Sequence, residues 1–367
     1  MTSPEITLVG HPFAPIGMGE TLRSTFRSFR AVGLCPKILD VFESSQPDAD
    51  MWAEFSPHLT QQAGNGINIF CINGNEVDPI LQHLGQRAVG GKRIIQPAWE
   101  LPHYPAEWAR EVERFDEAWG FSSFVSSTLK SAVSIPVRTL PLATAIRRIR
   151  NLGRRDFGIP EGAFVFLFFF DLTSFIERKN PFATLNAFQK VIDSFAGGDI
   201  RFVVKLNSSH AKAADRQRFL EFIQPFGDHV ILLDRRMDDA EVKALHLCAD
   251  AFVSLHRAEG YGFGLAEAMF LQKPVIGTGW SGNLDFMNHE NSILISYKLV
   301  PVPANAYPHA QGQEWAEADN DEAAQAMIRL AKSRSYGEAL GLRASRFIRT
   351  FFSHRAIGLR AKALLNI

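Results

Sequence analysis

Short apolar runs alternate with helix-length amphipathic segments along most of this chain. Apolar runs of four to eight residues separated in this way are typical of the strands of a parallel sheet with crossover helices. The run from Phe164 to Phe170 is apolar throughout, as expected for a central strand buried on both faces. We predict strands at Ile6–Val9, Lys37–Phe42, Ile67–Ile72, Arg93–Pro97, Ala118–Phe121, Val137–Leu142, Phe164–Phe170, Arg201–Leu206, Val230–Leu233, Ala251–Leu255, Pro274–Ile276 and Ile293–Ser296. The pattern therefore predicts an α/β protein.

Two regions interrupt the alternation. Residues 143–157 contain five arginines beside Gly153 and no strand-like run, so we place a domain boundary here, with domains at 1–150 and 151–345. We interpret the arginines as a solvated linker helix; the alternative is a basic patch facing an anionic membrane, worth about 1 kcal/mol per residue. After Ser296 the prolines at 301, 303 and 308 predict irregular chain. The tail is expected to form helices at 322–332, 337–350 and 354–365.

Composition narrows the class of protein. The 367 residues are 46% hydrophobic and carry no net charge, which argues against a nucleic-acid partner. The longest apolar run is far shorter than the roughly 20 residues that span a bilayer, and the N-terminus does not resemble a signal peptide. Three widely spaced cysteines, with no CxxC, HExxH or HxH pattern, indicate reduced thiols of a cytoplasmic protein. We therefore expect no metal and no cofactor.

The segment from Ala251 to Met287 gives the strongest indication of a ligand-binding site. A buried strand is followed by glycines at 260, 262 and 264 and by a helix that begins near Leu265. Such a loop brings backbone N–H groups and the positive end of a helix dipole to an anion, typically a phosphate. Two carboxylates, Glu259 and Glu267, flank the loop. Because carboxylates do not bind phosphate, we expect them to bind hydroxyl groups, and phosphate with hydroxyls indicates a nucleotide sugar. The alternative is that both favour the helix start electrostatically.

Three further loops follow predicted strands, where ligands of open parallel sheets bind. Arg178 and Lys179 precede a helix that Asn180 caps, a position suited to holding a phosphate; otherwise they are solvated charges. Gly17 and Gly19 follow the first strand without forming GxGxxG, so they are either a ligand-facing loop or a simple turn. Glu100 is either a functional carboxylate or a surface loop residue.

The sequence from Glu259 to Glu267, EGYGFGLAE, resembles the E-x7-E signature of retaining glycosyltransferases with the GT-B fold, specifically family 4 (glycosyl transferases group 1). The resemblance extends through Lys273-Pro274-Val275-Ile276 and covers about residues 155–290. It implies two Rossmann-like α/β/α domains that face each other across a cleft. The N-terminal domain would bind the acceptor and the second domain the donor. The last helix, in 346–367, would cross back to the N-terminal domain.

The resemblance also implies roles for the second domain. Glu259 would hold hydroxyls of the donor sugar, and Glu267 the ribose hydroxyls. Lys179 matches the diphosphate lysine of the family, but the arginine a few residues before it is absent. Either Arg178 or Arg257 would replace that arginine. The resemblance also implies that the loops contact the sugar or the phosphate through Ser174, Gly260, Tyr261, Gly262 and Phe263.

In the N-terminal domain, Gly17 and Gly19 match the glycine loop that approaches diphosphate and acceptor, and Glu100 stands near the place of a family histidine. The resemblance implies metal-independent transfer of a mannose- or glucose-type hexose from GDP- or UDP-sugar, with GDP-mannose slightly favoured. The acceptor would be a saccharide or a lipid-linked saccharide in polysaccharide biosynthesis. The enzyme would be cytoplasmic, with peripheral contact at the inner face of a membrane. The alternatives are a nucleotide-sugar 2-epimerase and a non-catalytic sugar-nucleotide-binding protein.

Overall fold

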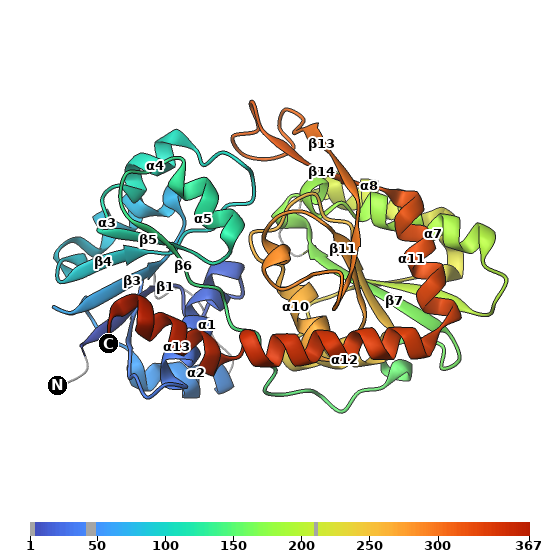
Figure 1. Ribbon diagram of the computed structural model, residues 1–367, viewed down its shortest axis with the longest axis horizontal. Helices are drawn as coiled ribbons and strands as arrows, with labels where there is room; N and C mark the ends of the chain where they lie inside the picture. The colour runs from blue at the N-terminus through green and yellow to red at the C-terminus, as the bar shows by residue number, and fades with distance from the viewer. Residues whose placement is uncertain (1–3, 42–48, 209–211) are drawn as a thin grey trace. The chain divides into compact units, whose positions relative to one another are not determined.

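The computed structural model describes residues 4–41, 49–208 and 212–367 and divides into two compact units. The first comprises Met1–Thr144 with Thr350–Ile367, and the second Ala145–Arg349. The boundaries expected from the sequence were 150 and 345. Figure 1 shows helices packed against the sheet of each unit.

The first unit is built on a parallel sheet with the strand order β2-β1-β3-β4-β5-β6. All five residues of β1 are buried, because this strand lies inside the sheet between β2 and β3. The described strands are β1 (Ile6–Gly10), β2 (Lys37–Asp40), β3 (Ile67–Cys71), β4 (Lys92–Ile95), β5 (Glu117–Gly120) and β6 (Val137–Thr139). Each lies at a predicted apolar run; Phe42, at the end of one run, lies outside the described residues.

Helix α1 (Gly17–Arg30) follows β1 and buries Leu22, Phe26 and Phe29, the face that the spacing of these residues indicates. Helix α13 (His354–Leu365) packs against α1, although more than 300 residues separate them. A Cβ at Gly358 would lie 2.2 Å from the carbonyl oxygen of Ser28, so only glycine permits this approach. The remaining helices of the unit are α2 (Ala49–Phe55), α3 (Val77–Leu84), α4 (Ala106–Val112) and α5 (Ser123–Lys130).

The second unit contains a parallel sheet with the order β12-β11-β10-β7-β8-β9. The central strand β7 pairs with β8 along its whole length. The strands are β7 (Phe164–Asp171), β8 (Ile200–Asn207), β9 (Val230–Asp234), β10 (Ala251–Ser254), β11 (Val275–Thr278) and β12 (Ile293–Ile295). The helices are α6 (Ile176–Lys179), α7 (Pro181–Ser194), α8 (Ala213–Ile223), α9 (Asp239–Cys248), α10 (Phe263–Phe270), α11 (Asn320–Lys332) and α12 (Arg334–Phe351).

Residues 297–318 form a β-hairpin rather than the irregular chain predicted. Strand β13 (Tyr297–Pro301) pairs antiparallel with β14 (Glu314–Ala318), and Trp315 of β14 is buried. The prolines misled the prediction because they lie at the end of β13 and in the loop beyond it, where they remove no ladder hydrogen bond within the strand.

The prediction of a linker helix in residues 143–157 is also wrong. Residues 145–153 have no regular structure, and a 3-10 turn, η4 (Arg154–Phe157), follows. Arg154 is not solvated: it donates to the carbonyl oxygen of Cys248 at 3.0 Å and to the Asp250 carboxylate at 2.8 Å. The guanidinium thus ties the start of the second unit to the segment before β10.

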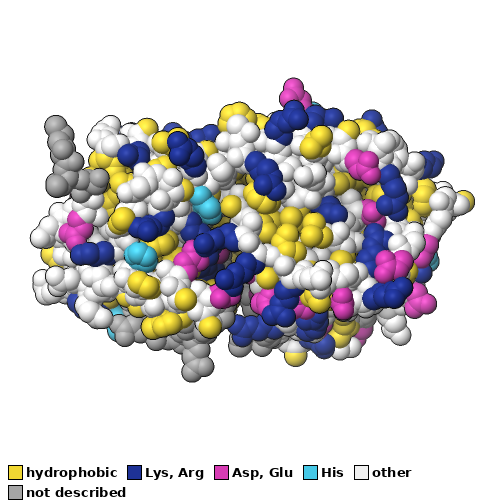
Figure 2. Space-filling model, turned by 90° about the horizontal axis from the view of Figure 1, so that it is seen from below, with side chains coloured by type: hydrophobic (Ala, Val, Ile, Leu, Met, Phe, Trp, Pro, Cys, Tyr) yellow, Lys and Arg dark blue, Asp and Glu magenta, His cyan; other side chains and the backbone are white. Residues whose placement is uncertain are grey.

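Figure 2 shows that basic and acidic side chains are interspersed on one face of the molecule, in keeping with the net charge of zero. Among the described helices, none combines the length and the hydropathy that a membrane span requires.

Candidate functional site

Three neighbouring strands of the second unit, β11, β10 and β7, end at the same edge of the sheet. Because parallel strands align their carboxyl ends, the loops after them meet there. The loop after β7 leads into α6, the loop after β10 leads into α10, and the loop after β11 contains Ser281 and Gly282. Most of the sequence-predicted site residues lie in these loops or in the helices α6 and α10 that follow them.

The loops after β10 and β11 contact each other through their backbones. The N–H of Gly282 donates to the carbonyl oxygen of Glu259 at 2.8 Å, and the N–H of Glu259 donates to Oγ of Ser281 at 2.8 Å. A Cβ on residue 282 would lie 1.9 Å from the carbonyl oxygen of Gly260. Gly262, the N-cap of α10, has φ of 97°, which favours glycine. These contacts fix the backbone around Glu259.

The carboxylate of Glu259 lies between two cations of the short helix α6, which follows the loop after β7. Nζ of Lys179 is 2.5 Å from Oε1, and Nη1 of Arg178 is 3.3 Å from Oε2. Burial alone would raise the pKa of Glu259, but Lys179 and Arg178 outweigh it and lower that pKa to about 2. Glu259 is therefore an ionised carboxylate with little exposed surface, 9% of the residue.

Arg178 is held from several sides. Its Nη1 also donates to the carbonyl oxygen of Ala258 at 2.9 Å, and its guanidinium lies 5.8 Å from the centre of the Tyr307 ring. Its exposed fraction is 5%. The next residues turn sharply, because Asn180 has φ of 52° and accepts from the N–H of Ala183 to cap α7. This turn, predicted as a helix cap, directs Arg178 and Lys179 towards Glu259.

Arg257, unlike Arg178, is bonded to carboxylates other than Glu259. It contacts the Glu317 carboxylate at 2.6 Å and that of Glu177 at 3.2 Å, and it lies over the Trp315 ring. It therefore connects α6 to the β13–β14 hairpin. Of the two arginines considered for the missing family position, the structure brings Arg178 to Glu259.

Glu267 lies on α10 and contacts two side chains of α9. Nζ of Lys243 is 2.6 Å from Oε1, and Nε2 of His246 is 3.7 Å from Oε2. Burial would raise the pKa of Glu267, but Lys243 and His246 lower it to about 2. Burial would lower the pKa of Lys243, whereas Glu267 and Asp239 raise it above its usual value. Lys243 and His246 were not predicted as site residues, since a lysine on a helix is usually solvated.

A buried histidine, also missed, supports the loop after β10. His256 is bonded through Nδ1 to Oγ of Ser254 at 3.2 Å and through Nε2 to Oδ1 of Asn283 at 3.0 Å. Thr278 donates to the carbonyl oxygen of His256 at 2.7 Å. Burial lowers the pKa of His256, so the ring is neutral at neutral pH. Its position directly before Arg257, at the end of an apolar run, was the available signal.

Ser174, Tyr261 and Phe263, also predicted from the sequence, lie within a few residues of Arg178 or Glu259 along the chain. Ser174 ends the 3-10 turn η5 (Leu172–Ser174) and precedes Phe175, which has φ of 63°. Tyr261 is buried, with its ring centre 5.1 Å from that of Phe263 and 5.2 Å from that of Phe286. The Tyr261 ring therefore belongs to the core, and the backbone contacts that the resemblance implies for Tyr261 and Phe263 stay a prediction.

Gly17, Gly19 and Glu100 belong to the first unit. A Cβ at Gly19 would lie 2.3 Å from the carbonyl oxygen of Ala14, whereas Gly17 has open space around it. Arg23 holds the preceding loop by donating to the carbonyl oxygens of Pro12 and Ala14, both at 2.9 Å. Glu100 follows β4, two strands from β1, at the same carboxyl edge of that sheet.

Cations, backbone donors and carboxylates thus converge at the carboxyl edge of the second sheet. Among residues 4–41, 49–208 and 212–367, no cluster of three or more His, Cys, Asp or Glu side chains is arranged for a metal ion. The arrangement suits a ligand with both an anionic group and hydroxyl groups.

Residues 163–332 match the family model described as Glycosyl transferases group 1. No curated protein sequence matches the chain. The structure is similar to sucrose-phosphate synthase from Thermosynechococcus elongatus, with 15% identity, a TM-score of 0.71, and coverage of 99% of this chain and 98% of that one. It is also similar to Anabaena Alr3699/HepE in complex with UDP-glucose, with 12% identity, a TM-score of 0.71 and full coverage of both chains. A third similar structure, OtsA, has 10% identity, a TM-score of 0.68 and 99% coverage of both chains.

These similarities and the two six-stranded parallel sheets confirm the predicted α/β class with two Rossmann-like units of the GT-B type. The family match confirms the predicted resemblance to glycosyl transferases group 1.

Proposed function

Because residues 163–332 match the family model of glycosyl transferases group 1, we propose that this protein is a retaining glycosyltransferase. It transfers a hexose from a nucleotide diphosphate sugar to a saccharide or lipid-linked saccharide in glycan biosynthesis. The observation that carries this proposal is the pairing of Glu259 with Lys179 and Arg178 beside the N-terminus of α10.

In the proposed mechanism, the donor diphosphate lies against Lys179, Arg178 and the backbone N–H groups around Gly262. Breaking the bond between the anomeric carbon and the diphosphate oxygen leaves negative charge on the diphosphate and positive charge on the sugar ring. The acceptor hydroxyl oxygen bonds to the anomeric carbon, and its proton passes to the departing diphosphate. Fixed cations and N–H donors stabilise the leaving diphosphate, each worth about 3 kcal/mol by analogy with oxyanion sites. No metal is needed for this step.

Glu259 has two roles in this proposal. In the free protein its carboxylate is the counterion of Lys179 and Arg178. With donor bound, it accepts hydrogen bonds from hydroxyls of the hexose, and its low pKa keeps it an acceptor at any physiological pH. Glu267 accepts from the ribose hydroxyls, and Lys243 keeps it ionised.

We propose a UDP-sugar as the donor, since Anabaena Alr3699/HepE, which shares the fold, has been solved with UDP-glucose. The test is a panel of UDP-, GDP- and dTDP-sugars, scored by the rise in melting temperature and then by transfer to acceptor extracts. A ligand at about 100 times its Kd stabilises the folded state by about 2.7 kcal/mol. Absence of stabilisation by every sugar of the panel would refute the proposal.

Two arms of this experiment address the alternatives. Incubation with donor alone detects a 2-epimerase, because epimerisation needs no acceptor. Glu259→Ala should abolish transfer without unfolding the protein, whereas a non-catalytic binding protein would show no transfer before or after the substitution.

A further inference from the structure

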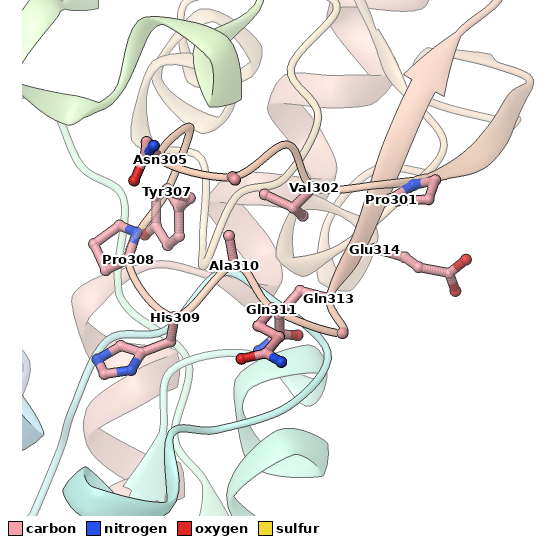
Figure 3. Close-up of a pocket in the computed structure, with 12 residues that line it drawn as sticks. Pro301, Val302, Asn305, Tyr307, Pro308, His309, Ala310, Gln311, Gln313 and Glu314 are labelled. Atoms are coloured by element: carbon pink, nitrogen blue, oxygen red, sulfur yellow. The ribbon is translucent and has the colours of Figure 1, made fainter.

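The loop that joins β13 to β14 lines a pocket that is open to the surface. The cavity measures about 830 Å³ and is lined by residues between Pro301 and Glu314. Figure 3 shows Val302, Tyr307 and Ala310 inside the curve of this loop, whereas the carboxylate of Glu314 points away from it. Cavities of roughly 300–1,000 Å³ hold ligands of drug size, so the volume suits a short oligosaccharide.

The loop has a fixed shape. Within it, the N–H groups of Val302, Ala306 and Gln313 donate to carbonyl oxygens of the same loop at 2.9, 3.0 and 3.1 Å. Asn305 and His309 have positive φ values of 65° and 51°. Asn and His are among the non-glycine residues that adopt this region most readily, so both turns suit their sequence. The pocket is therefore preformed rather than created by a ligand.

The lining has the chemistry of a neutral, hydroxyl-rich ligand. No Lys or Arg is among the described residues that form it. The polar side chains of the lining are the amides of Asn305, Gln311 and Gln313, the imidazole of His309 and the carboxylate of Glu314, and Tyr307 with Pro308 supplies apolar surface. Amides pair with hydroxyl groups in either direction, and a sugar ring packs its C–H face on an aromatic ring. A phosphate group, in contrast, would require cations.

The pocket adjoins the candidate donor site through Tyr307. The Tyr307 ring lines the pocket, lies 4.7 Å from the ring centre of Phe175 and has the Arg178 guanidinium 5.8 Å from its centre. Arg178 in turn contacts Glu259. Phe175 is 39% exposed. A chain of three contacts thus leads from the pocket to the carboxylate.

We propose that the pocket within residues 301–314 binds a neutral saccharide portion of the acceptor, in a subsite next to the transferred sugar. This inference rests on the proposed function, since it takes Glu259 and Arg178 as the donor side. The hairpin then selects acceptors by the sugar units behind the reacting hydroxyl group.

The test uses the full-length protein and saturation-transfer NMR with maltotriose, mannotriose, chitotriose and uridine. Ala304 is exposed and lines the pocket, so Ala304→Trp places a large side chain at the pocket and removes no side chain that contacts Arg178. The matched control is Ala196→Trp, because Ala196 is also exposed and precedes β8, at the opposite edge of the sheet. We expect at least one trisaccharide to bind, with its signal reduced at least fivefold by Ala304→Trp and unchanged by Ala196→Trp.

The proposal is overturned if none of the three trisaccharides binds, if Ala304→Trp leaves the signal unchanged, or if both variants reduce it equally. Loss of the uridine signal in place of a trisaccharide signal would also overturn it, since the pocket would then serve the donor base. The rise in melting temperature with UDP-glucose is measured on the same samples. That readout tests the proposed function, and the trisaccharide signal tests the pocket, so the failure of one is distinguishable from the failure of the other.

Discussion

Replacing Glu259 by glutamine removes a buried negative charge and leaves Lys179 and Arg178 without their shared carboxylate. The pKa of Glu259 is lowered from 4.5 to about 2 in the folded protein. A shift of this size corresponds to about 3 kcal/mol of folding free energy at neutral pH. For a unit of this size, roughly 2–4 °C of melting temperature accompany each kcal/mol. Glu259→Gln should therefore lower the melting temperature of the second unit by about 6–12 °C at pH 7.

The pH dependence tests the cause of this loss. Because the folded pKa of Glu259 lies below the unfolded one, its contribution is complete above about pH 4.5 and is lost as the pH falls towards 2. The difference in unfolding free energy between wild type and variant should shrink from about 3 kcal/mol at pH 7 to about 2 kcal/mol at pH 3.5. Thermal and urea unfolding at the two pH values measure it.

The matched control is Glu161→Gln, since Glu161 is an exposed carboxylate of the same unit, 3.5 Å from Arg155. Surface pairs of this kind contribute little, so we expect a change below about 0.5 kcal/mol at both pH values. A Glu259→Gln variant as stable as wild type, or a difference that grows as the pH falls, would refute the reasoning. The variant should also bind UDP more tightly than wild type, because the two cations no longer have an internal counterion.

Three further substitutions test the support of the site. Gly282→Ala places a Cβ 1.9 Å from a backbone oxygen of the loop after β10, so we expect about 1–3 kcal/mol of destabilisation and loss of transfer. The control is Gly153→Ala, which has open space around the new Cβ and should change the free energy of unfolding by less than about 0.5 kcal/mol. Lys243→Met removes the cation from the buried Glu267 carboxylate and leaves His246 as its neighbour, so we expect a loss of about 3–5 kcal/mol in urea unfolding at pH 7. Because the folded pKa of Lys243 is raised, this loss should decline above pH 10.5. His256→Phe removes both hydrogen bonds of the ring and should lower the free energy of unfolding by about 1–3 kcal/mol. Because burial lowers the folded pKa of His256, the wild-type ring stabilises the fold fully above pH 6.5 and less as the pH falls. Wild-type stability in any of these three site variants would contradict the contacts described.

The sequence predicted the parallel sheets because their signals are local. A fully apolar run such as Phe164–Phe170 indicates a central strand by itself, and the glycines at 260 and 262 mark a loop that needs close approach or positive φ. The cap at Asn180 also followed from residue type and position. These elements were found at their predicted places.

The contacts that complete the site were not predictable in the same way. Lys243 meets Glu267 across 24 positions of the chain, and Arg257 meets Glu317 across 60, so only the packing of α9 and of the hairpin brings them together. The hairpin itself was hidden by its prolines, which lie where the strands end. Long-range pairs of charges leave no period in the sequence.

In the linker, residues 143–157, a local pattern led to a wrong prediction. Its arginines suggested a solvated helix, yet Arg154 is committed to backbone oxygens and to Asp250. A cluster of like charges in a sequence says nothing about partners that arrive from distant segments.

The central claim is that Lys179 and Arg178, paired with Glu259, hold the diphosphate of a sugar donor. Calorimetric titration of UDP-glucose into wild type and Lys179→Met tests it most directly. A charge-assisted hydrogen bond is worth about 1.5–3 kcal/mol, so the account predicts binding to wild type and affinity reduced by roughly 10- to 150-fold in the variant. Equal affinity of the two proteins for UDP-glucose would contradict it.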